Sequence, residues 1–405
     1  MAVTFPRGWR AGSAACGIKA FTAGASAIPS GQKDDLAVVF SDRPCDAAGV
    51  FTTNKVKSAT IVIDQLHLRQ NRVQAVVINS GNANACTGAQ GYKDALQMAK
   101  LTADRLDLDP PQVVVSSTGV IGRYLPMDAV KTGIAAACAS LTEAGGEGAA
   151  KAIMTTDTVP KQSTGVVQIG GVEVRVGGMC KGSGMIHPNM ATMLAYVTSD
   201  AAVEPGFLSQ IVKRVADGSF NQVTVDGDSS TNDSFLVLAN GAAGNPPVAA
   251  GTPEAEALEA ALLAVARDLA RQIARDGEGA TRLITVGVSG GASSEEARMA
   301  ARAVASSSLV KTAIHGGDPN WGRIVCALGY SGAELAIDRL ELSIAGLTVF
   351  SRGAGQPVDL DAVRAAFEQP EILIHAELGL GEGSAEAWGC DLSEEYVRIN
   401  ADYTT

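Results

Sequence analysis

Along the chain, short apolar runs bounded by glycine and small polar residues alternate with longer segments of helical spacing. The short runs predict strands at 37–40, 75–78, 113–115, 192–198, 235–239, 283–288, 334–350 and 395–399. A further short apolar run lies at 59–63. A hairpin with a two-glycine turn is predicted over 166–176. Apolar residues recur every three or four positions at 92–106, 126–143, 205–217, 254–275, 294–308 and 360–367. The pattern predicts a mixed α/β protein.

The composition is that of a globular protein. Hydrophobic residues make up 46% of the 405 residues, which is enough for a large core in one to three domains. No apolar run approaches the ~18–20 residues of a membrane span, and the first residues lack the features of a secretion signal. We therefore expect a soluble, cytoplasmic protein. The net charge of −11, without any long basic run, makes nucleic acids and anionic membranes poor partners.

The cysteines and histidines give no sign of a metal or redox site. The seven cysteines lie far apart without a Cys-x-x-Cys pair, and the four histidines stand singly. Because zinc and redox sites need clustered ligands, we expect no metal and no other cofactor. The thiols are interpreted as small buried apolar groups. Glycine accounts for 45 of the 405 residues, which is more than the typical share of ~7% and indicates many tight turns.

The stretch 177–200 joins a glycine-containing loop to a strand-like run. Its loop ends in Ala191, and Thr192 begins the run. A hydroxyl residue in this position can attack the preceding carbonyl, move the acyl group from N to O and, after hydrolysis, become a new N-terminus. Its free α-amine, with a pKa of ~7.7–8.0, then serves as its own general base. An Ala-Thr pair at such a junction is, however, more often only the start of a strand.

Two other loops carry candidate chemistry. The run at 113–115 enters the small residues and glycines of 116–122, which can aim successive N–H groups at one point as an oxyanion hole does, or can simply turn the chain. The string 223–233 begins with a strand-like run, which is followed by Asp226, Asp228 and several hydroxyl residues. Such a string could suggest a cation site.

A different enzyme class is suggested by Gly287–Gly291, which fits the G-x-S-x-G nucleophile elbow of α/β-hydrolases. Ser289 would be the nucleophile, and Asp338 or Asp359 and then His375 follow in the hydrolase order. Ser289 lies late in the chain, which leaves little sheet after it. The pattern is also expected by chance in a glycine-rich sequence.

The string Lys181-Gly-Ser-Gly-Met185, then Pro188, then Ala191-Thr-Met-Leu194, closely resembles the signature of the ornithine acetyltransferases, also called bifunctional glutamate N-acetyltransferases. The resemblance runs over essentially the full length. It includes the segments 49–54, 79–87, 118–119, 155–158, 276–280, 315–323, 399–401 and 403–405. The family pattern also includes the string 223–233 without a metal role, which implies loop chemistry around a pocket instead of a cation site.

The resemblance implies a self-cleaving enzyme. Cleavage before Thr192 would give an alpha chain of residues 1–191 and a beta chain of residues 192–405, which assemble as an α2β2 heterotetramer. The implied fold is α/β, with layered sheets and helices resembling N-terminal-nucleophile hydrolases but with different connectivity. The implied reaction moves an acetyl group from N2-acetyl-L-ornithine to L-glutamate in the cyclic arginine pathway. Some members also accept acetyl-CoA, and the residues leave that second activity open.

The resemblance also assigns roles to single residues. Thr192 is the nucleophile, and Thr118 with Gly119 form the oxyanion hole. The substrate-binding positions are Thr155, Lys181, Thr192, Glu278, Asn400 and Thr405. A lysine can pair with an α-carboxylate and a glutamate with a substrate ammonium, so these residue types suit an amino-acid pocket. A self-cleaving aminopeptidase or amidase using the same threonine, and an amino-acid-binding protein that never cleaves, remain alternatives.

Overall fold

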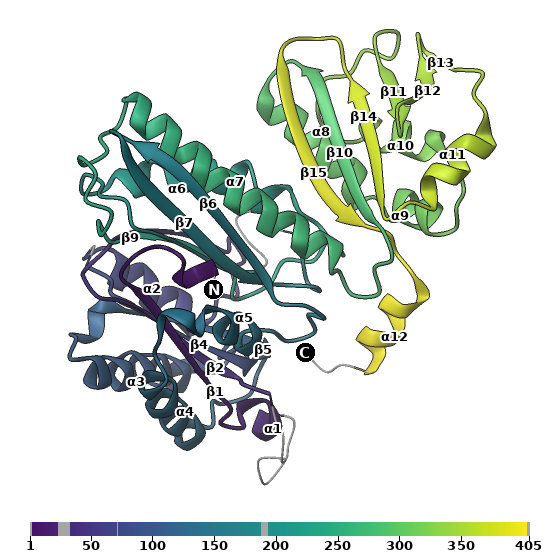
Figure 1. Cartoon of the computed structure of the whole chain (residues 1–405). Helices are drawn as coiled ribbons and strands as arrows, with labels where there is room; N and C mark the ends of the chain where they lie inside the picture. Colours follow the sequence, from purple (N-terminus) through teal and green to yellow (C-terminus); the bar gives the residue numbers. More distant parts are fainter. Residues whose placement is uncertain (1, 23–32, 71, 188–192, 403–405) are drawn as a thin grey trace.

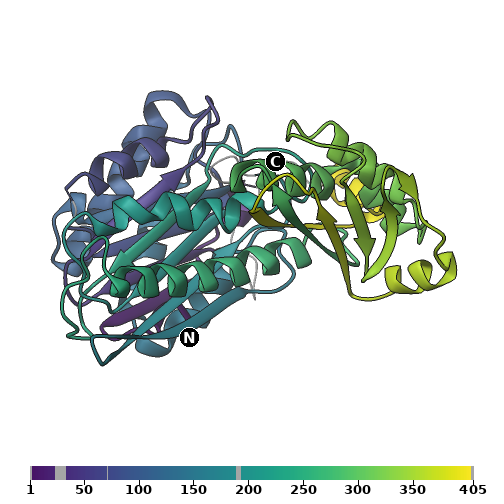
Figure 2. The ribbon, with the colours of Figure 1, turned by 90° about the horizontal axis from the view of Figure 1, so that it is seen from above.

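The computed structural model describes residues 2–22, 33–70, 72–187 and 193–402. Two bodies are visible in Figure 1: a larger one with two sheets stacked between layers of helices, and a smaller one built on a third sheet. The view in Figure 2 shows the two bodies side by side, with the helices of the larger body lying over its sheets.

The first sheet of the larger body has the order β1-β2-β4-β5. Its strands are β1 (Trp9–Ala14), β2 (Leu36–Ser41), β4 (Ala75–Asn82) and β5 (Val113–Val120). Only β4 and β5 run parallel. Helices α3 (Gly88–Leu106) and α4 (Met127–Ala139) pack on its outer face, as their apolar periodicity predicted, although α4 is shorter than expected. The remaining short helices of this region are α1 (Ile18–Thr22) and α5 (Gly146–Ala152).

The apolar run at 59–63 belongs to helix α2 (Ala59–Leu68), whose first turn is capped by Ser58. Asp64 of this helix is fully buried, and its Oδ1 accepts a hydrogen bond of 2.7 Å from the backbone N–H of Val115. Since β5 is an edge strand, this bond satisfies a donor that has no strand partner. Burial raises the pKa of Asp64 well above its ordinary value.

The second sheet has the order β3-β9-β8-β7-β6, so that β9 and β8 lie in its middle. Its strands are β3 (Asp46–Phe51), β9 (Ser234–Ala239), β8 (Leu194–Ser199), β7 (Val172–Lys181) and β6 (Lys161–Ile169). Gly170 and Gly171, with φ of +56° and +79°, form the predicted hairpin turn. Helices α6 (Phe207–Asp217) and α7 (Pro253–Arg275) cover the outer face.

Apolar side chains from the facing surfaces of both sheets, among them Ile78, Val114 and Tyr196, form one core. The larger body is therefore a four-layer stack of helices, sheet, sheet and helices, as the layered α/β prediction requires.

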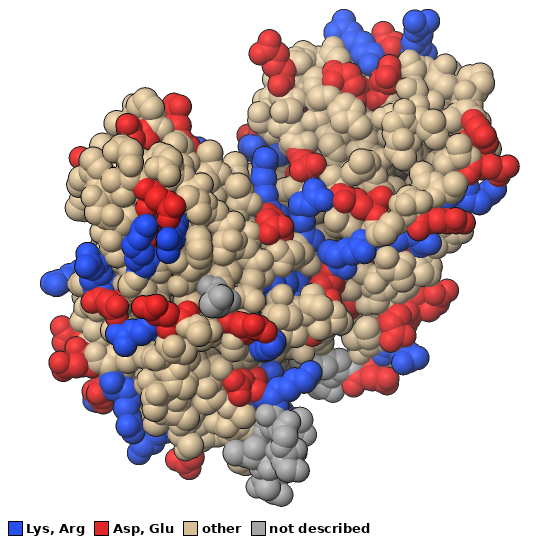
Figure 3. All heavy atoms as spheres, viewed as in Figure 1, with Lys and Arg blue, Asp and Glu red and all other residues tan. Residues whose placement is uncertain are grey.

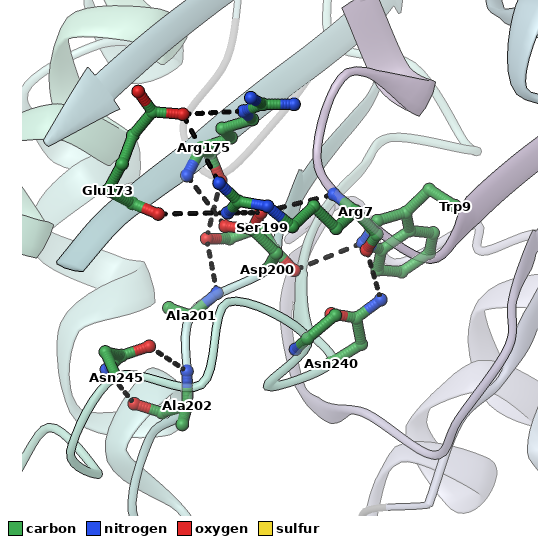
Figure 4. A network of polar contacts seen from close by, with 11 residues as sticks. Arg7, Trp9, Glu173, Arg175, Ser199, Asp200, Ala201, Ala202, Asn240 and Asn245 are labelled. Carbon is green, nitrogen blue, oxygen red and sulfur yellow. Dashed lines mark hydrogen bonds and ion pairs between the residues drawn. The ribbon is translucent and has the colours of Figure 1, made fainter.

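The far end of β8 is held by a polar network around Asp200 (Figure 4). The buried carboxylate accepts 2.7 Å hydrogen bonds from the backbone N–H of Arg175 and from Nη1 of Arg7. The indole N–H of Trp9 donates to the carbonyl of Ser199 at 3.1 Å. The start of the chain thus fastens β8 at the end opposite to Leu194.

The smaller body contains a six-stranded sheet in the order β13-β12-β11-β14-β10-β15. The strands are β10 (Leu283–Gly291), β11 (Glu341–Ile344), β12 (Leu347–Ser351), β13 (Ala354–Gly355), β14 (Glu371–Glu377) and β15 (Gly383–Cys390). Its helices are α8 (Ser294–Ser306), α9 (Ser308–His315), α10 (Trp321–Gly329) and α11 (Leu360–Phe367). These helices share an apolar core with the sheet.

Two expectations from the sequence are wrong. Residues 395–399 form part of helix α12 (Glu394–Asp402) and not a strand. Val397 and Ile399 favour strands, but Glu394 and Glu395 in the first turn stabilise a helix through its dipole. The second error concerns the cysteines, because Cys86 and Cys326 are exposed while the others are buried or partly buried. No helix in the described part of the chain is long and apolar enough to cross a membrane.

Candidate active site

A cavity of about 140 Å³ opens where β5 and β7 end and β8 begins. Its walls come from both sheets of the larger body, from the loop at 226–233 and from α12. The residues that line it include Thr118, Gly119, Thr155, Lys181, Gly184, Met185, Met193, Asp226, Asp228, Asp233, Glu278, Tyr396 and Asn400.

Thr118 and Gly119 stand near the end of β5, next to the parallel strand β4. Gly119 has φ of +131°, and a Cβ atom there would lie 2.2 Å from the carbonyl carbon of Gly81. A side chain is therefore excluded on both conformational and steric grounds. Both residues line the cavity, which is where the predicted donor pair for a developing oxyanion would have to lie.

Lys181 ends β7 and lies directly opposite Leu194, the first residue of β8. Its Nζ donates to Oγ1 of Thr155 at 2.8 Å and to Oγ1 of Thr118 at 3.4 Å. Burial lowers the pKa of Lys181, and the nearby carboxylate of Asp157 opposes that shift. One cationic group thus joins the predicted oxyanion residue to a predicted substrate-binding residue.

Asp157 supports this arrangement through hydrogen bonds. Its carboxylate accepts hydrogen bonds from the backbone N–H of Thr155 at 3.0 Å and of Gly182 at 2.7 Å, and from Nζ of the buried Lys161 at 2.6 Å. Burial alone would raise its pKa, but Lys181 and Lys161 lower the pKa of Asp157 to about 2. Asp157 is therefore ionised, and its carboxylate holds the backbone at Thr155 and Gly182 in place.

Glu278 also lines the cavity and is almost completely buried. Nδ2 of Asn400 in α12 donates to its Oε2 at 2.8 Å, and its own backbone N–H donates to the carbonyl of Ser183 at 2.8 Å. A Cβ atom at Gly184 would lie 2.4 Å from the Glu278 carboxylate. Glycine at 184 is thus what lets the carboxylate lie against the loop.

The loop that follows is clamped by Asp226. Its two carboxylate oxygens accept from the backbone N–H groups of Met185 at 2.5 Å and Ile186 at 2.8 Å. Met185 has φ of +56°, which is unusual for a residue with a side chain and costs conformational energy. Val225 and Ser229 add hydrogen bonds to the carbonyls of Ile186 at 2.7 Å and His187 at 3.0 Å. The loop therefore holds a strained conformation over the residues that lead toward position 191.

Sequence reasoning identified the string 223–233 as loop chemistry around a pocket, and the structure confirms this, but it assigned none of the single residues. Asp226, Asp228, Asp233 and Tyr396 all line the cavity. Burial raises the pKa values of Asp226 and Asp233. The signal for Asp226 was its position after a strand-like run, but its partners are backbone groups about 40 residues away.

Six predicted site residues meet at this cavity: Thr118, Gly119, Thr155, Lys181, Glu278 and Asn400. Ala191, Thr192 and Thr405 lie outside the described residues. The next described residue after Thr192 is Met193, which is part of the cavity wall.

The hydrolase alternative fails on geometry. Oγ of Ser289 lies 3.0 Å from Nε2 of His375, as the motif suggested, but it donates its proton to the carboxylate of Glu377. His375 must then donate to Ser289, so it cannot act as the base. Asp359 instead caps α11, and no acid in the described part of the chain binds Nδ1 of His375.

Among the residues that the structure describes, no group of three or more His, Cys, Asp or Glu side chains could hold a metal ion. Lysine and arginine are interspersed with aspartate and glutamate over the face shown in Figure 3. The charged side chains that line the cavity are Lys181, Asp226, Asp228, Asp233 and Glu278.

The chain is similar to known proteins over its whole length. The family model that matches is described as the ArgJ family and covers residues 10–405. The arginine biosynthesis bifunctional protein ArgJ of Symbiobacterium thermophilum is 52% identical over 405 residues, which is 100% of this chain and 98% of the relative. The protein of the same name from Dehalococcoides mccartyi is 48% identical, over 100% of this chain and 97% of the relative. A crystal structure of arginine biosynthesis bifunctional protein argJ from Bacillus halodurans is 42% identical, with a TM-score of 0.50 over 51% of this chain and 98% of that chain.

Proposed function

This chain belongs to the ArgJ family, and we propose that it is an acetyltransferase of arginine biosynthesis that transfers an acetyl group from N2-acetyl-L-ornithine to L-glutamate. The observation that carries the proposal is the meeting of Thr118, Gly119, Thr155, Lys181, Glu278 and Asn400 around a single cavity whose wall includes Met193.

The cavity suits a substrate with the charges of an amino acid. Lys181 pairs with the α-carboxylate that ornithine and glutamate share, and Glu278 pairs with a substrate ammonium. Thr155 and Asn400 already hydrogen bond to these two charged side chains and orient them. Thr405 is assigned to substrate binding by the family resemblance alone. Removing Thr404 and Thr405 is expected to impair transfer while self-cleavage continues, because cleavage needs no substrate.

The nucleophile in this proposal is Thr192. The adjacent residue in the sequence, Met193, is part of the cavity wall, which supports this assignment. The Thr192 hydroxyl attacks the acetyl carbonyl while the Thr192 α-amine takes its proton. Thr118 and Gly119 stabilise the tetrahedral oxyanion. The α-ammonium of Thr192 then gives this proton to the substrate nitrogen, the C–N bond breaks, ornithine leaves as the amine, and an acetyl ester of Thr192 remains. The glutamate amine attacks this ester and regenerates the hydroxyl.

The α-amine becomes available only when the bond between Ala191 and Thr192 is cut. Self-cleavage would yield residues 1–191 and 192–405, which remain associated in an α2β2 assembly located in the cytoplasm. The strained loop at 184–187, clamped by Asp226, supports this step because it fixes the backbone that leads to the bond.

The first experiment tests cleavage and the acyl-enzyme together. Purified protein should migrate as two fragments, and N2-acetyl-L-ornithine without glutamate should add one acetyl mass to the fragment that begins with Thr192. Added glutamate should remove that mass. Thr192→Ala should stay whole and unacetylated. Cleavage of this variant at the same bond, or acetylation elsewhere, would refute the assignment of Thr192.

A self-cleaving amidase with water as the acceptor is the second candidate, because it would use the same threonine and the same oxyanion donors. Acetate release is the discriminating measurement: an amidase releases acetate at its full rate without glutamate, whereas the transferase requires the acceptor. The same assay with acetyl-CoA as the only donor tests whether N-acetylglutamate is also made from that thioester.

A further inference from the structure

A second cavity, of about 820 Å³, lies on the other side of the 185–187 loop, between the two bodies of the protein. Its walls are formed by the turn after β3, by η4 (Phe220–Gln222), by the end of α6 and by α8. Its polar and charged lining residues include His187, Lys213, Asp217, Gln222, Glu295, Arg298 and Arg302.

Arg302 carries a guanidinium that lacks a counter-ion. Its Nη2 donates to Nε2 of His187 at 3.0 Å, and its Nε is buried without any hydrogen-bond partner among the described residues. Burial lowers the pKa of Arg302, which reflects the cost of keeping this charge away from water.

His187 does not supply the missing negative charge. Because a guanidinium only donates, Nε2 must accept, and the ring proton sits on Nδ1, which faces Oγ1 of Thr224 at 3.0 Å. Burial, with Arg302 nearby, lowers the pKa of His187 to about 4. The histidine is therefore neutral, and the pair keeps the full positive charge of Arg302.

Gln222 provides an independent sign of an unfilled site. Its side chain is only 4% exposed and lines the same cavity, yet its Oε1 has no hydrogen-bond partner. A buried carbonyl oxygen without a partner costs free energy, and rotation of the amide by half a turn would put the Nε2 donor in its place.

The charges around the cavity favour an anion. Lys213 and Asp217 neutralise each other in an ion pair of 2.5 Å. The other charged residues of the lining are Glu295, Arg298 and Arg302, which leaves a net positive charge there. We propose that this cavity binds a small oxyanion, a carboxylate or a phosphate, through the guanidinium groups of Arg298 and Arg302 with Gln222 as a further hydrogen-bond partner.

The bound anion takes up donors of the guanidinium that now contacts His187. His187 belongs to the loop that Asp226 and Ser229 hold beside the active site. Binding therefore changes the surroundings of the His187 ring, and this gives the site a spectroscopic signature that a general surface effect lacks.

The test uses the full-length protein with inorganic phosphate and, separately, acetate as probes in isothermal titration calorimetry. We expect one saturable site per chain whose affinity falls at least tenfold in Arg302→Gln, a variant that keeps a side-chain amide to donate to His187. Gln222→Leu should weaken binding in the same direction. Arg364→Gln, which removes an exposed arginine of α11, should change nothing. Tighter binding of phosphate identifies phosphate-bearing ligands, and tighter binding of acetate identifies carboxylates.

The location is checked by following the imidazole signals of the four histidines by NMR during the phosphate titration. The His187 signal should shift in the wild type and stay in place in Arg302→Gln. Failure of both probes to bind, or binding that survives in Arg302→Gln but is lost in Lys181→Met, would overturn the proposal. The latter result would place the anion in the active site.

Discussion

The contact between Asn400 and Glu278 links the last helix to the active site and leads to a quantitative prediction. Asn400→Ala removes the 2.8 Å hydrogen bond to the Glu278 carboxylate. Hydrogen bonds to charged groups contribute ~1.5–3 kcal/mol. Because Asn400 itself is exposed, we take the lower end of this range. A loss of about 1.5 kcal/mol corresponds to roughly a tenfold lower kcat/KM.

The assay is steady-state acetyl transfer with N2-acetyl-L-ornithine and glutamate varied in turn, with the cleaved fraction measured on the same sample. Arg398→Ala is the matched control, because this exposed side chain lies on the same helix and forms an ion pair with Glu395. It should leave kcat/KM unchanged. A value for Asn400→Ala within twofold of the wild type, in fully cleaved protein, would show that α12 does not help to orient Glu278.

Three further predictions concern Asp226, Lys181 and Asp64. Asp226→Asn keeps one acceptor and turns a donor toward a backbone N–H, which should slow self-cleavage by roughly tenfold or more; wild-type kinetics of fragment appearance on a gel would count against the clamp. Because burial lowers the pKa of Lys181, the Michaelis constants should rise with pH below the ordinary lysine range, and Lys181→Arg should move that rise to higher pH; superimposable pH profiles would contradict this. The folded state keeps Asp64 protonated where the unfolded chain has lost the proton, so the wild type loses stability as pH rises above the ordinary carboxyl pKa. Urea unfolding should accordingly show Asp64→Asn gaining stability relative to the wild type between pH 5 and pH 8, and a constant difference would argue that the carboxyl is ionised.

Local pattern predicted most of the helices well. The segment 360–367 coincides with α11, and 254–275 differs from α7 by one residue at its start. Such segments have an amphipathic repeat of their own, so their helical conformation can be predicted without the rest of the fold. For α12 the local preference of Val397 and Ile399 was misleading. There the helix places Tyr396 and Asn400 one turn apart along the cavity wall, which is a tertiary requirement.

The site shows the same division. Thr118, Gly119, Lys181 and Glu278 could be named because a family resemblance links positions that are distant in the sequence. The role of Asp226 could not be named, because its partners are main-chain N–H groups and leave no trace in residue type. The uncompensated charge of Arg302 is likewise invisible until α8 is packed against the loop that holds His187.

In the five-stranded sheet, β9 and β8 lie between β3 on one side and β7 and β6 on the other. A cut between 191 and 192 assigns the two inner strands to one polypeptide and the three outer strands to the other. Neither polypeptide can then complete the sheet alone. Refolding of the processed protein from denaturant becomes a bimolecular reaction whose rate depends on concentration, whereas the intact Thr192→Ala chain refolds as a single molecule. The uncleaved chain can thus refold at any dilution. The cleaved protein would instead persist because it unfolds slowly.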